Sequence, residues 1–217
     1  MVAKTLWHKK LLAVICLPAL LLALPAGAAD TPEMLGDTPE TLMEKAQAAF
    51  NQADIVSAMS LYRQAAETGF TPAQVRLAYL LDNSEENEAA VSWYRMAAEQ
   101  GDAEGMFGLA QMLAAGEGIQ QDDQQAVVWY TQAARQGHQP AIRVLALAYE
   151  KGELGLNVSY GQAVSWLNAG VAAEDVWSSK RLAHAYRRGE LGLRIDLEQA
   201  NFLENRLTRK KTETTLP

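Results

Sequence analysis

Cysteine is almost absent from this 217-residue chain, and its single copy, Cys16, lies inside an apolar run near the N-terminus. Once that run is removed, the chain can form neither a disulfide nor a thiolate metal site. Histidine is scarce as well, and only His138 and His184 lie beyond the first 28 residues. Neither has a second histidine or a cysteine nearby in the sequence, which disfavours a metal cluster. We expect no metal and no cofactor, and a fold held together by packing alone.

The first 28 residues have the order of a secretory signal peptide. Lysines precede an almost unbroken apolar run over 11–24, and Ala26-Gly27-Ala28 supplies an A-x-A cleavage site. A membrane anchor is the weaker alternative, because the run is about 14 residues long and a spanning helix needs about 20. We therefore predict export to the periplasm or beyond, with no transmembrane segment left in the mature chain. Residues 29–38 contain proline and glycine and are expected to be a flexible leader.

Charge is distributed unevenly. Residues 29–137 contain 17 acidic and 5 basic residues, whereas 176–217 contain 5 acidic and 9 basic ones. A chain that is acidic over most of its length is unsuited to wrapping a nucleic acid. β-Branched residues are few beside alanine, leucine, glutamine and glutamate, a composition that favours helix.

Internal repetition is the clearest pattern in the sequence. An Ala-Ala-x-x-Gly ending recurs at 65–69, 97–101 and 133–137, with a looser copy at 169–173. A large apolar residue precedes each ending or its equivalent, at Leu61, Trp93, Trp129, Trp166 and Leu203. A Leu-Ala pair recurs in phase at 77–78, 109–110, 145–146 and 182–183. A period of 32 to 37 residues predicts stacked supersecondary units.

Each unit is predicted to be a pair of helices. A glycine suited to a left-handed cap follows the first helix in three units, at Gly116, Gly152 and Gly189. Capping-box spacings begin the second helix, at Asp122/Gln125, Ser159/Gln162 and Asp196/Gln199. The alanines allow close helix approach, and we expect Trp93, Trp129 and Trp166 to fill the space between pairs. One pair cannot bury its apolar face alone, so the pairs must stack.

The pattern Ala-x-x-x-Leu-Ala/Gly-x-x-Tyr/Leu-x-x-Gly, then Ala-x-x-Trp, then Ala-Ala-x-x-Gly, resembles Sel1-like repeats, which are relatives of the tetratricopeptide repeat. The resemblance covers about 70–209, and the opening unit, with Ala46, Phe50 and Tyr62, is similar to a plain tetratricopeptide unit. The unit at Phe70 lacks the turn glycine, and the last unit replaces tryptophan by Leu203 and loses the Ala-Ala-x-x-Gly ending, as an end cap would.

The resemblance implies an all-α, right-handed α-solenoid of stacked antiparallel helix pairs over 39–211. The expected units are about 41–69, 70–101, 102–137, 138–174 and 175–211, followed by a tail at 212–217. It also implies a superhelical scaffold for protein–protein assembly, which in exported bacterial relatives often serves envelope assembly, signalling or polysaccharide secretion.

The sequence contains no recognisable catalytic motif. No serine stands in a nucleophile-elbow setting, and no glycine-rich loop follows a strand. Gly116-Glu-Gly118 is explained as a turn between helices. We therefore predict no catalytic residues and a protein that is not an enzyme.

The candidate partner-binding residues come from comparing equivalent positions between units. The Leu-Ala positions hold their character because they pack, whereas two columns three residues apart vary freely and share a helix face. One column contains Tyr79, Gln111, Leu147 and His184, and the other contains Arg76, Gly108, Val144 and Arg181. By resemblance, first helices line the concave surface where partners dock.

The last unit adds a basic cluster on this face, made of Lys180, Arg181, His184, Arg187 and Arg188. It is either a solvated end cap or an anionic docking site. Two functions stay open: a scaffold that binds protein partners, and a module that binds an anionic polymer such as an acidic exopolysaccharide. The acidic majority of the chain would repel a polyanion, so the scaffold is favoured.

Overall fold

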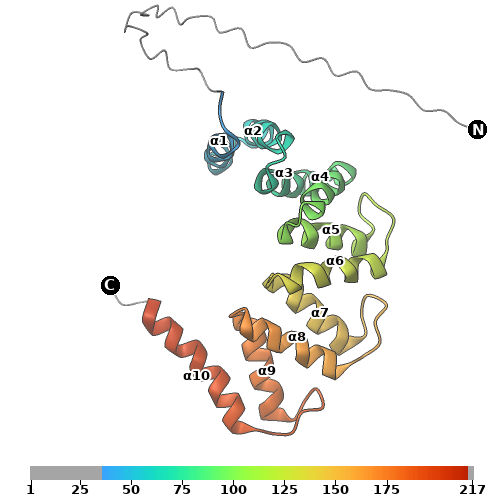
Figure 1. Cartoon of the computed structure of the whole chain (residues 1–217), viewed down its shortest axis with the longest axis vertical. Helices are drawn as coiled ribbons and strands as arrows, with labels where there is room; N and C mark the ends of the chain where they lie inside the picture. Colours follow the sequence, from blue (N-terminus) through green and yellow to red (C-terminus); the bar gives the residue numbers. More distant parts are fainter. Residues whose placement is uncertain (1–35, 215–217) are drawn as a thin grey trace, which may run out of the picture. The chain divides into compact units, whose positions relative to one another are not determined.

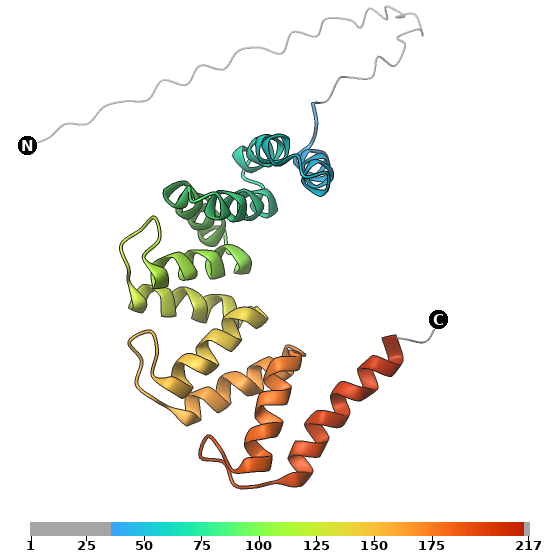
Figure 2. The same cartoon turned by 180° about the vertical axis from the view of Figure 1, so that it is seen from behind.

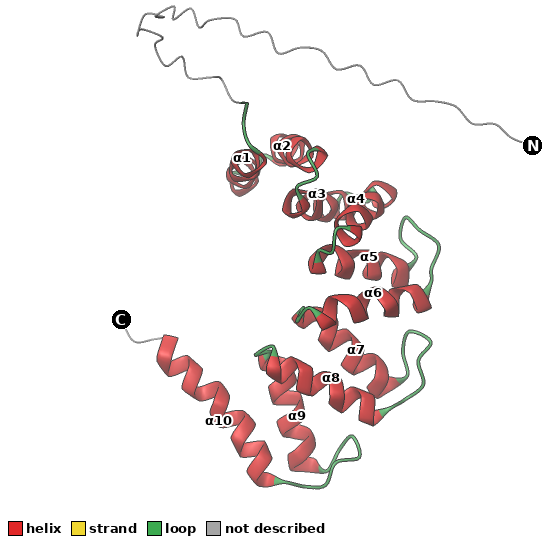
Figure 3. Ribbon diagram, in the orientation of Figure 1, coloured by secondary structure: helices red, strands yellow, loops and turns green. Residues whose placement is uncertain are grey.

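The computed structural model describes residues 36–214, with side-chain surroundings through Arg206, and every regular element in that range is an α-helix (Figures 1 and 3). This confirms the all-α prediction. The helices are α1 (Pro39–Asn51), α2 (Ile55–Glu67), α3 (Thr71–Asn83), α4 (Asn87–Glu99), α5 (Ala103–Ala115), α6 (Asp123–Arg135), α7 (Gln139–Lys151), α8 (Tyr160–Ala172), α9 (Val176–Arg188) and α10 (Leu197–Thr214).

Helices that are neighbours in the sequence pack on each other throughout, from α1 on α2 to α9 on α10 (Figures 1 and 2). The first helices of the second and third units, α3 and α5, also touch each other. Each pair therefore covers the apolar face of the next, as a solenoid requires. The longer loops of the last three units, 116–122, 152–159 and 189–196, lie along one edge of the array (Figure 2).

The helix ends follow the predicted capping chemistry. Gly116, Gly152 and Gly189 cap α5, α7 and α9 in the left-handed conformation, with φ of 74°, 76° and 69°. A Cβ at these angles would be strained, so glycine suits them. The side chains of Asp122 and Ser159 accept hydrogen bonds from backbone N–H groups in the first turns of α6 and α8. The same contact joins Asp196 to Gln199 at the start of α10.

The core consists of the repeated alanines and leucines. All the Leu-Ala pairs and the Ala-Ala endings at 65–66, 97–98 and 133–134 are buried. The tryptophans pack against this core without being enclosed by it: Trp93, Trp129 and Trp166 are half-buried. The next residue in each helix, Tyr94, Tyr130 or Leu167, is the one that is buried. This residue lies three positions before the buried alanine or its equivalent and shares its helix face, whereas the tryptophan, one residue earlier, is rotated about 100° around the helix.

The predicted signal peptide at 1–28 and most of the leader at 29–38 lie outside the described residues. Thr38 caps α1 through its side-chain oxygen, so the array begins at Pro39. At the other end α10 continues to Thr214, three residues into the segment expected to be a tail.

Candidate partner-binding face

The column formed by Tyr79, Gln111, Leu147 and His184 lies on α3, α5, α7 and α9, the first helices of four successive units. Tyr79, Gln111 and His184 are exposed, and Leu147 is half-buried. Tyr79 is the largest of them and leaves 50% of its surface accessible. These positions are open to solvent because the helix turns its Leu-Ala face toward the core.

The positions of the second column are less exposed than the sequence comparison indicated. Arg76 is exposed, and Val144 and Arg181 are half-buried, but Gly108 is buried in α5. A Cβ on Gly108 would lie 2.4 Å from two ring carbons of Tyr94. The lack of a side chain at Gly108 is therefore a packing requirement of the neighbouring α4, not a sign of tolerance.

Two recesses adjoin each other at the N-terminal end of this face. The first, called here the Arg76 recess, has a volume of about 250 Å³ and lies among α1, α2 and α3. It is lined by Gln47, Phe50, Tyr62, Arg76, Tyr79 and Leu80. The Tyr62 hydroxyl donates to Oε1 of Gln47 over 3.1 Å, so the buried phenol is satisfied within the wall. Burial of Tyr62 also raises its pKa, which keeps this phenol neutral.

The second recess continues from the first toward α5 and has a volume of about 450 Å³. It is lined by Met43, Pro72, Val75, Arg76, Tyr79, Tyr94, Asp102 and Glu104. Arg76 and Tyr79 belong to both recesses, and together the recesses extend over the first helices of three successive units. The acidic residues of the second recess, Asp102 and Glu104, are gathered at its α5 end, and Arg76 lines both recesses.

Glu104 is held in place by the next unit. His138 caps α7 by accepting from the backbone N–H of Ala141 through Nδ1, and its Nε2 lies 3.0 Å from Oε2 of Glu104. An Nδ1 that accepts carries no proton, so in this tautomer Nε2 donates to the carboxylate. The hydrogen bond from His138 lowers the pKa of Glu104 below its ordinary value. Glu104 is therefore a fixed negative charge at the rim.

The basic cluster of the last unit is largely engaged in ion pairs. Arg181 contacts Glu150 of α7 at 2.6 Å and Glu190 at 2.8 Å, and the bond to Glu150 raises the pKa of the guanidinium. His184 Nδ1 lies 3.2 Å from Glu190. Of the remaining members, Arg187 forms an ion pair with Glu204 at 2.9 Å, and Lys180 and Arg188 are exposed to solvent.

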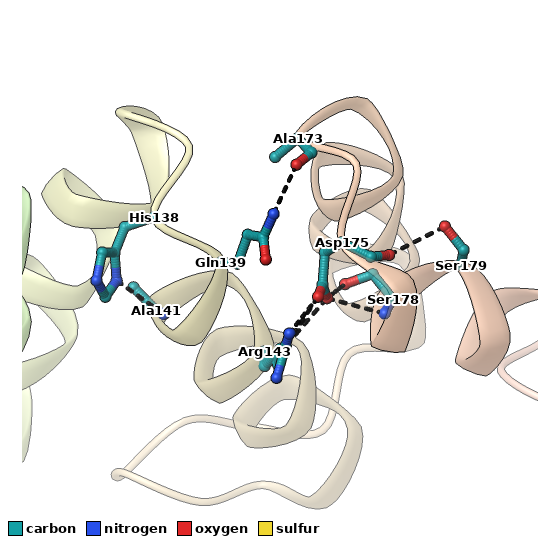
Figure 4. A network of polar contacts seen from close by, with 8 residues as sticks. All are labelled: His138, Gln139, Ala141, Arg143, Ala173, Asp175, Ser178 and Ser179. Atoms are coloured by element: carbon teal, nitrogen blue, oxygen red, sulfur yellow. Dashed lines mark hydrogen bonds and ion pairs between the residues drawn. The ribbon is translucent and has the colours of Figure 1, made fainter. Parts of the chain in front are cut away.

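A buried polar network that the sequence did not reveal joins the last two units (Figure 4). Asp175, at the start of α9, is fully buried and accepts a bifurcated hydrogen bond from Nε of Arg143 on α7, at 3.0 Å to Oδ1 and 3.1 Å to Oδ2, and a further one from its NH2. The same carboxylate caps α9 by accepting from the backbone N–H and the hydroxyl of Ser178. Burial by itself raises the pKa of Asp175, but the bonds from Arg143 and Ser178 outweigh it and leave the pKa lowered. This network fixes the register of α9 on α7.

Within residues 36–214, no three side chains of the histidine, cysteine, aspartate or glutamate type gather as metal ligands would. None of the helices in this range has the length and apolar character needed to cross a bilayer.

Comparisons with known proteins agree with this architecture. The family model described as Sel1 repeat matches residues 52–70, 71–102, 103–138, 140–173 and 180–203. No curated protein matches the chain.

Solved structures show the same fold. A Sel1 repeat protein from Oxalobacter formigenes is 24% identical with a TM-score of 0.68, over 77% of this chain and 69% of that one. A protective antigen of uropathogenic Escherichia coli strains that displays an SLR fold is 24% identical with a TM-score of 0.62; the match spans 79% of this chain but 46% of that protein. A sel1 repeat protein from Klebsiella pneumoniae subsp. pneumoniae is 19% identical with a TM-score of 0.52, over 81% and 88% of the two chains.

Proposed function

Because this chain belongs to the Sel1 repeat family, we propose that it is a non-enzymatic scaffold that holds a protein partner on the exposed face of its first helices. Sel1 repeat proteins generally mediate protein–protein interactions, and their fold is of a scaffold kind. The partner docks over α1, α3 and α5, where the Arg76 recess and the second recess adjoin.

The observation that carries this proposal is the pair of recesses that share Arg76 and Tyr79. Their walls combine exposed aromatic rings with a few charged groups. Interface cores in proteins are enriched in tyrosine, phenylalanine, methionine and arginine, and these four residue types line the two recesses. Neighbouring units contribute to one surface, so a segment longer than a single side chain can lie along it.

We base the proposed compartment on the predicted signal peptide. A signal peptide at 1–28 would deliver the array to the periplasm or the exterior, where we propose that it serves envelope assembly or signalling. Binding an anionic polymer through the basic cluster is the second candidate, supported by the exposed Lys180 and Arg188. The ion pairs of Arg181 and Arg187 leave less positive charge for a polyanion there, so the protein scaffold is the better-supported function.

The test is retention of partners by purified protein from a periplasmic extract, with bound proteins quantified by mass spectrometry. We expect Tyr79→Ser to lower the amount of specific partner, because it removes a half-exposed ring shared by both recesses. The matched control is Val128→Ser on α6, which removes an exposed apolar side chain from a second helix. Equal retention by Tyr79→Ser and the unaltered protein would contradict the proposed docking face.

A further inference from the structure

We propose that the Arg76 recess is a subsite for an aspartate or glutamate side chain that stands beside an aromatic or large aliphatic residue in an extended segment of the partner. This inference rests on the proposed scaffold function and specifies the chemistry of the segment that docks. The positive charge, the aromatic walls and the size of the recess each support it.

The charge of the recess is set by one residue. Arg76 is the only charged side chain among its lining residues, and no ion pair or hydrogen bond engages its guanidinium within the described part of the chain. The equivalent residue of the last unit, Arg181, is instead neutralised by Glu150 and Glu190. A guanidinium at a partly enclosed site pairs well with a carboxylate, because its planar fork can donate two parallel hydrogen bonds. Arg76 has these donors available, and its charge also acts at longer range on Glu104, where it helps to lower the pKa of that carboxyl.

The walls of the recess favour an apolar neighbour for that carboxylate. Phe50 of α1 is 37% exposed and Tyr79 of α3 is 50% exposed, so both rings have free surface at the recess. Tyr62 and Leu80 are buried residues that also line it. Aromatic rings gain from contact with other rings and aliphatic groups, and such contacts strengthen the charged hydrogen bond by excluding water.

The volume of the Arg76 recess suits a side chain. It holds about 250 Å³, which is below the roughly 300–1,000 Å³ typical of pockets for cofactors and drug-sized ligands. The second recess adjoins it and shares Arg76 and Tyr79, so the rest of a segment can continue there. We therefore assign it to an anchoring residue and its neighbour.

The surrounding charges argue for an isolated carboxylate and against a polyanion. Residues 29–137 carry 17 acidic side chains against 5 basic ones, so an extended run of negative charge would be repelled. Asp102 and Glu104 at the α5 end of the second recess repel a second acid there. The segment consequently has an acid over Arg76 and uncharged or basic residues toward α5.

The experiment uses a bead library of random hexapeptides with acetylated and amidated ends, screened with the mature chain and with Arg76→Gln. We expect the unaltered protein to enrich aspartate or glutamate next to phenylalanine, tyrosine, tryptophan or leucine. Arg76→Gln should keep the apolar preference and lose the acidic one. Arg63→Gln, which removes an exposed arginine of α2 outside both recesses, should select like the unaltered protein.

One selected peptide and its Asp→Asn or Glu→Gln twin are then measured by fluorescence polarisation at low salt. A partly exposed charged pair predicts that the twin binds the unaltered protein about five- to tenfold more weakly than the acidic peptide. The acidic peptide should lose affinity for Arg76→Gln by the same factor. The uncharged twin should bind Arg76→Gln and the unaltered protein with equal affinity. Circular dichroism of Arg76→Gln checks that the array is folded.

The outcomes separate the two proposals. Apolar enrichment without an acid, or equal affinity of the acidic peptide for Arg76→Gln, would overturn the carboxylate subsite while leaving the scaffold face in place. No enrichment of any kind would overturn the subsite. If, in addition, Tyr79→Ser retained as much partner as the unaltered protein, the proposed docking face would be contradicted as well.

Discussion

Replacing Asp175 by alanine should uncouple the last helix pair from the rest of the array. The buried carboxylate caps α9 and accepts hydrogen bonds from Arg143 on α7, so one substitution removes a helix cap and a contact between units. Loss of an N-cap costs about 1 kcal/mol, and loss of charged hydrogen bonds costs about 1.5–3 kcal/mol. The side chain of Arg143 is 40% exposed, so water partly replaces its lost partner. We expect a total loss of about 2–4 kcal/mol in the free energy of unfolding.

The loss should be local, because units of a solenoid are stabilised by their neighbours. Urea unfolding is expected to show α9 and α10 melting before the other helices, and hydrogen exchange read by mass spectrometry should locate the loss of protection there. The matched control is Asp102→Ala, which removes the equivalent cap at the start of α5, where the described residues form no ion pair with Asp102. It should cost about 1 kcal/mol. Protection lost uniformly along the chain, or an equal cost for both variants, would refute the coupling role of Asp175.

Three other outcomes are expected. Gly108→Ala should lower the free energy of unfolding by about 1–3 kcal/mol, because its Cβ would meet the ring of Tyr94; Gly161→Ala on α8 has open space and should raise it by up to about 1 kcal/mol in the same urea titration. The lowered pKa of Asp175 means that its contribution is present above the unfolded-state value of about 3.9 and is lost as pH falls through the folded-state value; unfolding between pH 5 and about pH 2 should therefore show a steeper decline for the unaltered protein than for Asp175→Asn. Intact mass spectrometry of the exported protein should find an N-terminus at Ala29, and a retained first residue would contradict the signal peptide.

The helices and their ends could be predicted because they depend on local patterns. The left-handed glycine caps and the capping boxes lie within a few residues of the groups that they satisfy, and the repeat period placed the pairs in order. The degree of burial within a pattern was harder to predict. A tryptophan and the following tyrosine both look like core residues, and only the register of the helix decides that Tyr94 and Tyr130 are the buried ones.

The candidate site depends on contacts between residues distant in sequence, which explains what sequence comparison missed. Tyr79 was identified because its column varies, but Phe50 of α1 and Glu104 of α5 join the same face only through stacking. Gly108 looked tolerant because the position differs between units, whereas a neighbouring ring imposes the glycine. The basic cluster looked free because Glu150, the partner of Arg181, lies 31 residues earlier in the chain.

The most direct test of the docking face is site-specific photocrosslinking in living cells. A photoreactive phenylalanine analogue is placed at Tyr79, and in a separate strain at Val128, which is similarly exposed but lies on the second helix α6. The account predicts that the analogue at Tyr79 captures a discrete protein partner, identified by mass spectrometry, and that the analogue at Val128 does not. Capture of the same partner with equal yield from both positions, or capture from Val128 alone, would contradict binding on the face of the first helices.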